Sequence, residues 1–175
     1  FGEPAPSAQV ETWDESDVAT IIQGTDYLGD SMASGDFDGD GIVDLLVNDY
    51  HDTVYVVSGP DFRASAGATI EDLAYQVWTD EATCLTSLGD WSGDGRDDWV
   101  AGYKWDSDYE EEGGALYFVE GSGDVSTSDW TTGAAGIRHG QAAVWKTTGS
   151  ELGHDCSAGD LDADGFAELQ VEGYS

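Results

Sequence analysis

Acidic side chains recur at alternate positions in three short stretches of this chain: GDFDGDGIVDLLV from Gly35, GDWSGDGRDDWVAG from Gly89 and GDLDADGFAELQVEG from Gly159. We call them loop 1 (residues 36–44), loop 2 (90–98) and loop 3 (160–168). Oxygen-bearing side chains occupy positions 1, 3, 5 and 9 of each loop, and a glycine occupies position 6. The oxygen-bearing residues are Asp36, Asp38, Asp40 and Asp44; Asp90, Ser92, Asp94 and Asp98; and Asp160, Asp162, Asp164 and Glu168. Like charges this close repel one another unless a cation lies among them, so the spacing predicts a cation in each loop.

The chemistry of these side chains favours calcium. Alternate residues of a tightly curved loop direct their oxygens inward, and the glycine supplies the backbone freedom for the turn. Ca²⁺ takes six to eight oxygen ligands, whereas Mg²⁺ demands a smaller octahedron and retains water. Position 7 would contribute its backbone carbonyl, from Ile42, Arg96 and Phe166, so its side chain is free to vary. We therefore expect three calcium ions.

The residues after each loop distinguish these sites from EF-hands. An EF-hand has helices on both sides and a bidentate Glu at position 12, but Val47, Ala101 and Val171 stand there. The segments that follow, IVDLLVN, DDWVAGY and AELQVEG, are short and rich in β-branched, aromatic or other apolar residues, which favours strands.

Each loop belongs to a longer repeat of strand-like segments. A short stretch of small and apolar residues precedes each loop: LGDSMAS from 28, TCLTSL from 83 and LGHDCSA from 152. Alternating runs follow at TVYVVSG from 53 and ALYFVEG from 115, and fourth segments at AYQVWT from 74 and AAVWKTT from 142. Four short strands separated by Gly-rich turns form the blade of a β-propeller. The sequence therefore predicts an all-β fold of four-stranded antiparallel blades, with about three repeats.

The order LGDSMASGDFDGDGIVDLLVNDY…VYVVSGP resembles the FG-GAP repeat, the unit of the integrin α-subunit propeller and of many bacterial extracellular proteins. The resemblance spans nearly the whole chain. It implies that the metal lies between the first two strands of a blade, so the loop positions above match the family's ligand positions residue by residue. Three departures from the family pattern occur: Ser92 replaces an acid, Glu168 replaces Asp, and the family's Phe-Gly before the first strand is Leu28-Gly29, Ala82-Thr83 and Leu152-Gly153. The middle repeat, which has both Ser92 and Ala82-Thr83, is therefore the most diverged.

The repeats divide the chain into four parts. Residues 1–27 resemble the end of a preceding blade with an outer strand, 28–81 form repeat 1, 82–151 repeat 2, and 152–175 an incomplete repeat 3. Propellers need about four to eight blades to close, and open sheets expose edges that invite pairing. We therefore expect the chain to be a segment of a larger propeller, or to close a ring as a homo-oligomer.

Composition excludes several classes of partner. The formal net charge is −32, from 37 acidic and 5 basic side chains, which opposes nucleic-acid binding. No apolar run approaches the roughly 20 residues that cross a bilayer.

The strong acidity suits an exported protein or one adapted to high salt. The start at Phe1, without Met or a signal segment, indicates a mature product or a fragment.

The cysteines and histidines supply little catalytic potential. Cys84 and Cys156 fall in the first strands of neighbouring repeats, and either one disulfide or two buried thiols fits that placement. His154 and Cys156 are two residues apart on a predicted strand and so share one face, but nothing else completes a nucleophilic site. We expect no enzymatic activity.

The resemblance implies a secreted, extracellular or cell-surface module for adhesion, structural assembly or partner binding, with calcium as a brace. Two alternatives stay open. The first is a non-catalytic propeller part of a secreted hydrolase or lyase. The second is a glycan-binding lectin, since Trp13, Trp105 and Trp130 fall near predicted loops. The strand residues Trp78, Trp99 and Trp145 are expected to pack between blades.

Overall fold

The computed structural model describes residues 24, 27–50, 53–64, 68–79, 81–105, 113–124, 126–128, 135–138 and 151–173. Its first sheet, blade 1, is an antiparallel meander in the order β1-β2-β3-β4. The strands are β1 (Met32–Gly35), β2 (Asp44–Asn48), β3 (Val54–Val57) and β4 (Ala74–Trp78). The apolar residues of β2 and β3 are consecutive (LLV and VYVV), so side chains on both faces of the sheet are mostly buried.

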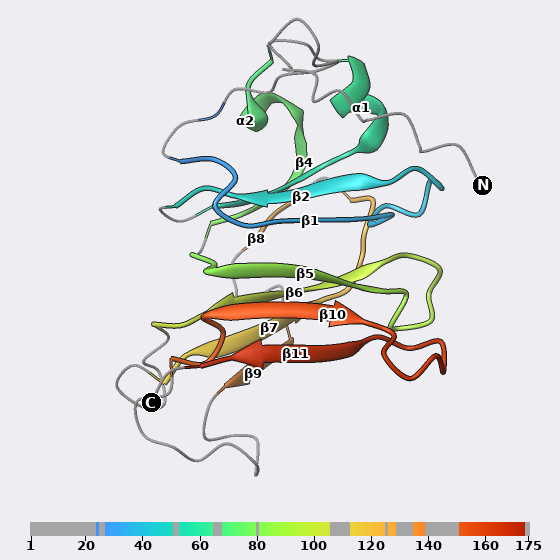
Figure 1. Ribbon diagram of the computed structural model, residues 1–175. Coiled ribbons are helices and arrows are strands. Elements are labelled where there is room, and N and C mark those ends of the chain that lie inside the picture. Colours follow the sequence, from blue (N-terminus) through green and yellow to red (C-terminus); the bar gives the residue numbers. More distant parts are fainter. Residues whose placement is uncertain are drawn as a thin grey trace, which may run out of the picture.

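The second and third sheets repeat this plan. Blade 2 has the antiparallel order β5-β6-β7-β9, and blade 3 pairs β10 with β11. The bounds are β5 (Cys84–Gly89), β6 (Asp98–Tyr103), β7 (Ala115–Val119), β9 (Ala135–Arg138), β10 (Asp155–Gly159) and β11 (Glu168–Glu172). The predicted all-β class of propeller-like blades is confirmed, and the three sheets do not close into a ring (Figure 1).

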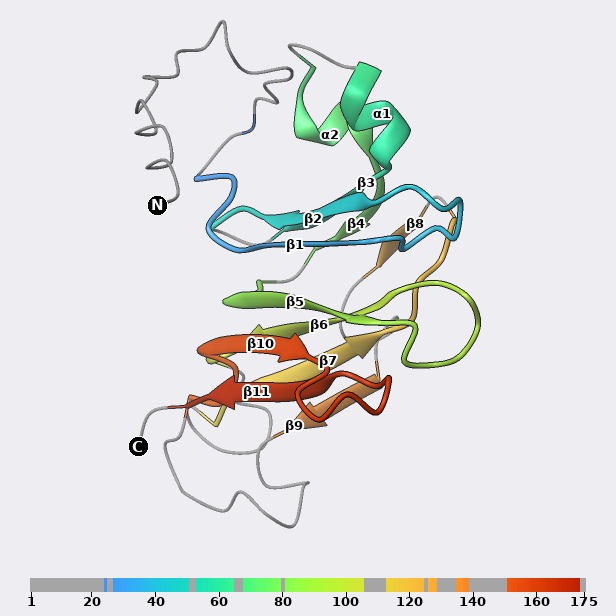
Figure 2. The same ribbon diagram turned by 45° about the vertical axis from the view of Figure 1, so that its right-hand side comes forward.

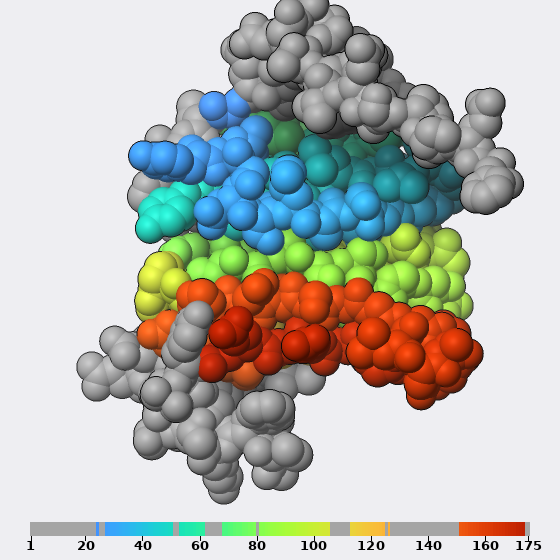
Figure 3. All heavy atoms as spheres, viewed as in Figure 1, coloured from blue at the N-terminus to red at the C-terminus, as the bar shows by residue number. Residues whose placement is uncertain are grey.

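The blades lie side by side as layers. Their first strands, β1, β5 and β10, are neighbours along one side of the molecule (Figure 2). In the space-filling view the three blades form successive packed bands in sequence order (Figure 3). This stacking places the three loops between first and second strands at the same end of their blades (Figure 1).

Two features of the connections were not predicted. Two short helices, α1 (Gly59–Ala64) and α2 (Ile70–Leu73), link β3 to β4. The connection from β7 to β9 contains β8 (Ser126–Ser128), which pairs in parallel with β4 and adds a fifth strand to the first sheet. Gln76 secures this crossing by donating from Nε2 to the carbonyl of Ser122 at 2.7 Å. A segment of repeat 2 therefore forms part of the first sheet.

The fourth strand of blade 2 is β9, which pairs with β7. It precedes, in the sequence, the segment that was expected to form this strand. That segment, AAVWKTT from 142, lies outside the described residues, as do Trp13, Trp130, Trp145 and most of the expected blade end and outer strand at 1–27. The repeat boundaries stay predictions.

The apolar core lies mainly between blades. Trp78 of blade 1 and Trp99 of blade 2 meet edge to face, with ring centroids 5.5 Å apart, as expected for tryptophans that pack between blades. A second cluster joins blades 2 and 3 through Val100, Leu116 and Leu169. The opposite face of blade 1 packs against α2, where Ile70 is buried. Adjacent blades thus share side chains, so each loop is positioned partly by its neighbour.

Candidate metal centres

The three loops share one backbone design. The position-6 glycines Gly41, Gly95 and Gly165 have φ values of 84°, 91° and 96°, which other residues rarely adopt. Each of these glycines donates its amide to the position-1 carboxylate at 2.9, 3.0 and 3.0 Å. The sequence pattern therefore identified the turn, because the glycine and the first aspartate close it together.

Loop position 4 also has a positive φ, a feature that the sequence analysis did not identify. Gly39 and Gly93 have φ values of 80° and 79° there, whereas loop 3 places Ala163 at 63°. The signal was visible as a second glycine in loops 1 and 2. A left-handed conformation costs a residue with a Cβ about 1–2 kcal/mol. Loop 3 therefore carries backbone strain that the other two lack.

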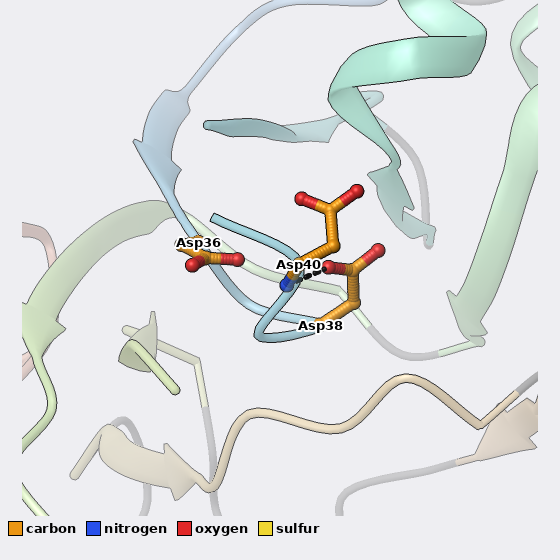
Figure 4. A group of neighbouring side chains, drawn as sticks. All are labelled: Asp36, Asp38 and Asp40. Carbon is orange, nitrogen blue, oxygen red and sulfur yellow. Dashed lines mark hydrogen bonds between the residues drawn. The ribbon is translucent and has the colours of Figure 1, made fainter. Parts of the chain in front are cut away.

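Loop 1 gathers three carboxylates. One oxygen from each of Asp36, Asp38 and Asp40 lies within 4.8 Å of the others, at a partly exposed position (Figure 4). The loop's own amides orient them: Asp38 Oδ1 accepts from the amide of Asp40 at 2.9 Å, and Asp40 Oδ1 accepts from Ile42 at 2.7 Å. An all-oxygen group of this size fits a hard divalent cation.

Asp44, the position-9 residue of loop 1, lies apart from that group. Its side chain is 2% exposed and accepts the amides of Phe37, Asp38 and Gly59 at 3.0, 3.2 and 2.8 Å. Burial raises the pKa of this carboxyl above its ordinary value. The Tyr75 hydroxyl donates to it at 3.3 Å, and burial also raises the pKa of Tyr75, so the phenol stays protonated. Asp44 fastens loop 1 to blade 1, and its role as a metal ligand stays a prediction.

Loop 3 gathers a different trio. Oxygens of Asp160, Asp162 and Glu168 lie within 4.8 Å of one another. Glu168 is one methylene longer than an aspartate, and its Oε2 also accepts the amide of Leu161 at 2.7 Å. Asp164 instead accepts the amide of Phe166 at 2.9 Å. The third carboxylate of the acidic group therefore comes from position 9 in loop 3 (Glu168) and from position 5 in loop 1 (Asp40).

In loop 2, acidic side chains bond to other groups of the same chain. The Asp94 carboxylate pairs with the Arg96 guanidinium at 2.9 Å. Asp98 is 2% exposed and accepts the amides of Ser92 at 2.6 Å and Gly121 at 3.0 Å. In the part of the chain that the structure describes, no group of three acids close enough for one ion occurs in this loop. The position-7 carbonyls of Ile42, Arg96 and Phe166 stay predicted ligands.

A disulfide joins blades 2 and 3. Cys84 of β5 and Cys156 of β10 are bonded, with Cα atoms 5.7 Å apart. This resolves the choice that the sequence left open. It also means that Cys156 has no free thiol for a Cys–His pair with His154.

These observations define a repeat protein of stacked, propeller-like blades with carboxylate-rich loops at one end. No model of a known protein family matches the sequence. The chain is similar to Integrin alpha-PS2 of Drosophila melanogaster, with 29% identity over 191 aligned positions that cover 95% of this chain. It spans 13% of the length of that protein. The match supports an integrin-like, FG-GAP-type relationship. Among the described helices, none is long and apolar enough to cross a membrane.

The strain in loop 3 predicts a reciprocal pair of effects. Replacing Ala163→Gly should raise the free energy of unfolding by about 1 kcal/mol, because the left-handed residue loses its Cβ. Gly93→Ala should lower it by a similar amount, since a Cβ there meets no atom within 4 Å and only the backbone is strained. Urea unfolding of both variants measures the two changes. If both substitutions change the free energy of unfolding in the same direction, position 4 is not strained in loop 3.

Proposed function

We propose that this chain is a calcium-braced propeller module that acts outside the cell in adhesion-type binding to a protein partner. The observation that carries the proposal is the threefold recurrence of acidic loops at the same end of stacked blades. The similarity to an integrin α subunit supports the extracellular, protein-binding part. Bound cations would offset part of the repulsion that accompanies a formal net charge of −32.

The ions would be held by oxygen donors alone. Loop 1 offers Asp36, Asp38 and Asp40, and loop 3 offers Asp160, Asp162 and Glu168. Carboxylate-rich loops with adaptable geometry suit Ca²⁺ better than Mg²⁺, which requires a rigid octahedron. Loop 2 is the weakest of the three, because Arg96 competes for Asp94. In each loop, calcium would relieve repulsion among carboxylates and fix the turn between two strands.

The partner-binding face lies at the opposite end of the blades. A hollow of about 240 Å³ opens where β2 and β6 end and where β1, β5 and β10 begin. Its lining includes Asp30, Tyr50, Glu81, Lys104, Trp105 and His154. Tyr50 and Trp105 are 50% and 42% exposed, and the Lys104 ammonium lies 4.3 Å from the centre of the Trp105 ring. Partly exposed aromatic side chains beside charges are typical of protein interfaces.

A non-catalytic role is part of this proposal. The bonded state of Cys156 supports it, since that sulfur is unavailable as a nucleophile. The accessory part of a secreted hydrolase or lyase is the second candidate, and it shares the same binding role. A lectin is the third, and the exposed Trp105 ring favours it because sugars stack on aromatic faces.

Surface plasmon resonance against a panel of extracellular-matrix proteins tests the binding face, with a glycan array run in parallel. We expect saturable binding to protein that Trp105→Ala weakens by about tenfold or more, the usual loss for a central aromatic anchor. Leu161→Ser is the matched control, because Leu161 is 78% exposed at the calcium end of blade 3. Binding on the glycan array alone would indicate a lectin. Equal losses in both variants would contradict the proposed face.

A further inference from the structure

Loop 1 is held by a residue of the neighbouring blade. The amide of Asp36 donates to Asp97 Oδ2 at 2.8 Å, and the amide of Asp97 donates to the Asp36 carbonyl at 2.9 Å. Both backbone polar groups of Asp36 are therefore bonded to one residue of loop 2. Asp36 is also the position-1 carboxylate, which accepts the amides of Gly39 and Gly41. Asp97 thus fixes the residue around which loop 1 folds.

The packing around this contact is close. A Cβ on Gly35 would lie 2.9 Å from Asp97 Oδ2, so the glycine is what permits the approach. A Cβ on Gly121 would collide with the carbonyl of Asp97 and lie 2.8 Å from that of Phe37. The Phe37 side chain is only 1% exposed and belongs to the core between blades 1 and 2. The contact is therefore continuous with the packing of the two blades.

Among the three loops, only loop 2 has a carboxylate at the position that makes this contact. Asp97 stands at loop position 8, where loop 1 has Val43 and loop 3 has Ala167. Val43 is 63% exposed, and neither residue carries a carboxylate. The junction between blades 2 and 3 therefore has no equivalent bond from position 8.

We propose that Asp97 is a positioning residue for the calcium site of loop 1, supplied by the adjacent blade. It does not contact the ion. It holds the backbone of Asp36 so that the Asp36 carboxylate is already oriented when the ion arrives. The inference rests on the proposed function, since it requires that loop 1 binds calcium. By linkage, calcium in loop 1 then also strengthens the docking of blade 1 on blade 2.

Amide NMR during a calcium titration tests this, because each loop has its own reporter: Gly41, Gly95 or Gly165. In Asp97→Ala, we expect the Gly41 midpoint to shift to about tenfold higher calcium, the low end for loss of an outer-shell partner. The Gly165 midpoint should stay unchanged. In Asp97→Asn, the Gly41 midpoint should return close to wild type, because the amide oxygen still accepts from Asp36.

Each other outcome overturns the inference in a recognisable way. An unchanged Gly41 midpoint in Asp97→Ala would show that the bond does not position the site. An equal loss in Asp97→Ala and Asp97→Asn would show that only the negative charge matters. Equal shifts at Gly41 and Gly165 would indicate general loss of structure. If Gly41 of the wild-type protein does not respond to calcium, the proposed function of loop 1 fails and the inference fails with it.

Discussion

Withdrawal of calcium is expected to lower the melting temperature by roughly 6–12 °C. At about 1 mM calcium and a Kd of about 10⁻⁴ M, each filled site adds about 1.4 kcal/mol to the free energy of unfolding. The two loops with acidic trios therefore contribute about 3 kcal/mol, and a chain of this size shifts by roughly 2–4 °C per kcal/mol. Calorimetry in calcium and in a chelator measures the difference.

Magnesium and salt provide the controls for this result. Magnesium at the same concentration should restore little stability, because it retains its water in flexible loops. The loss should be largest at low ionic strength, where repulsion among vacated carboxylates is least screened. A melting temperature that the chelator leaves unchanged would show that calcium is not a brace.

Loop 2 should lose its ion first during this withdrawal. Ser92 contributes a neutral hydroxyl where loops 1 and 3 have Asp38 and Asp162, and Arg96 already neutralises Asp94. Ser92→Asp and Arg96→Gln should therefore each tighten the site that the Gly95 amide reports. If neither substitution tightens that site, ligand charge does not set the order of calcium loss.

The local features of the blades could be predicted from the sequence because short-range chemistry determines them. The spacing of aspartates and glycine predicts the three loops, and the β-branched and aromatic residues of VYVV and LYFV predict β3 and β7. The loops recur between the first and second strands, as predicted. Trp99 was assigned to the space between blades, and the structure places it there with no exposed surface.

The contacts between blades could not be predicted in the same way. Asp97 lies next to Asp98 in sequence, yet its bond to Asp36 depends on how blade 2 docks against blade 1. The pairing of β8 with β4 likewise joins two repeats, and no local pattern in 126–128 marks it. The acidic trios also differ between loops, because Asp44 is buried and accepts three backbone amides, whereas Glu168 is partly exposed and accepts one. These features follow from tertiary packing, which a repeat pattern does not encode.

Removal of the disulfide is expected to lower the free energy of unfolding by about 4 kcal/mol, the loop-entropy value for a separation of this length. Cys84 and Cys156 are 72 positions apart in sequence, so the bond restricts a long segment of the unfolded chain. The double variant Cys84→Ser/Cys156→Ser measures the effect by urea unfolding. A reductant should destabilise the wild-type protein and leave the double variant unchanged.

The loss should be concentrated in blade 3, because the disulfide attaches its first strand to a better buried blade. All five residues of β10 are partly or fully exposed, whereas Cys84 of β5 is 3% exposed. Hydrogen exchange after reduction should therefore accelerate in β10 and β11 while β2 and β3 stay protected. Since β10 and β11 flank loop 3, reduction should also weaken calcium binding at Gly165 but not at Gly41. Uniform acceleration across all three blades would show instead that the bond stabilises the stack as one unit.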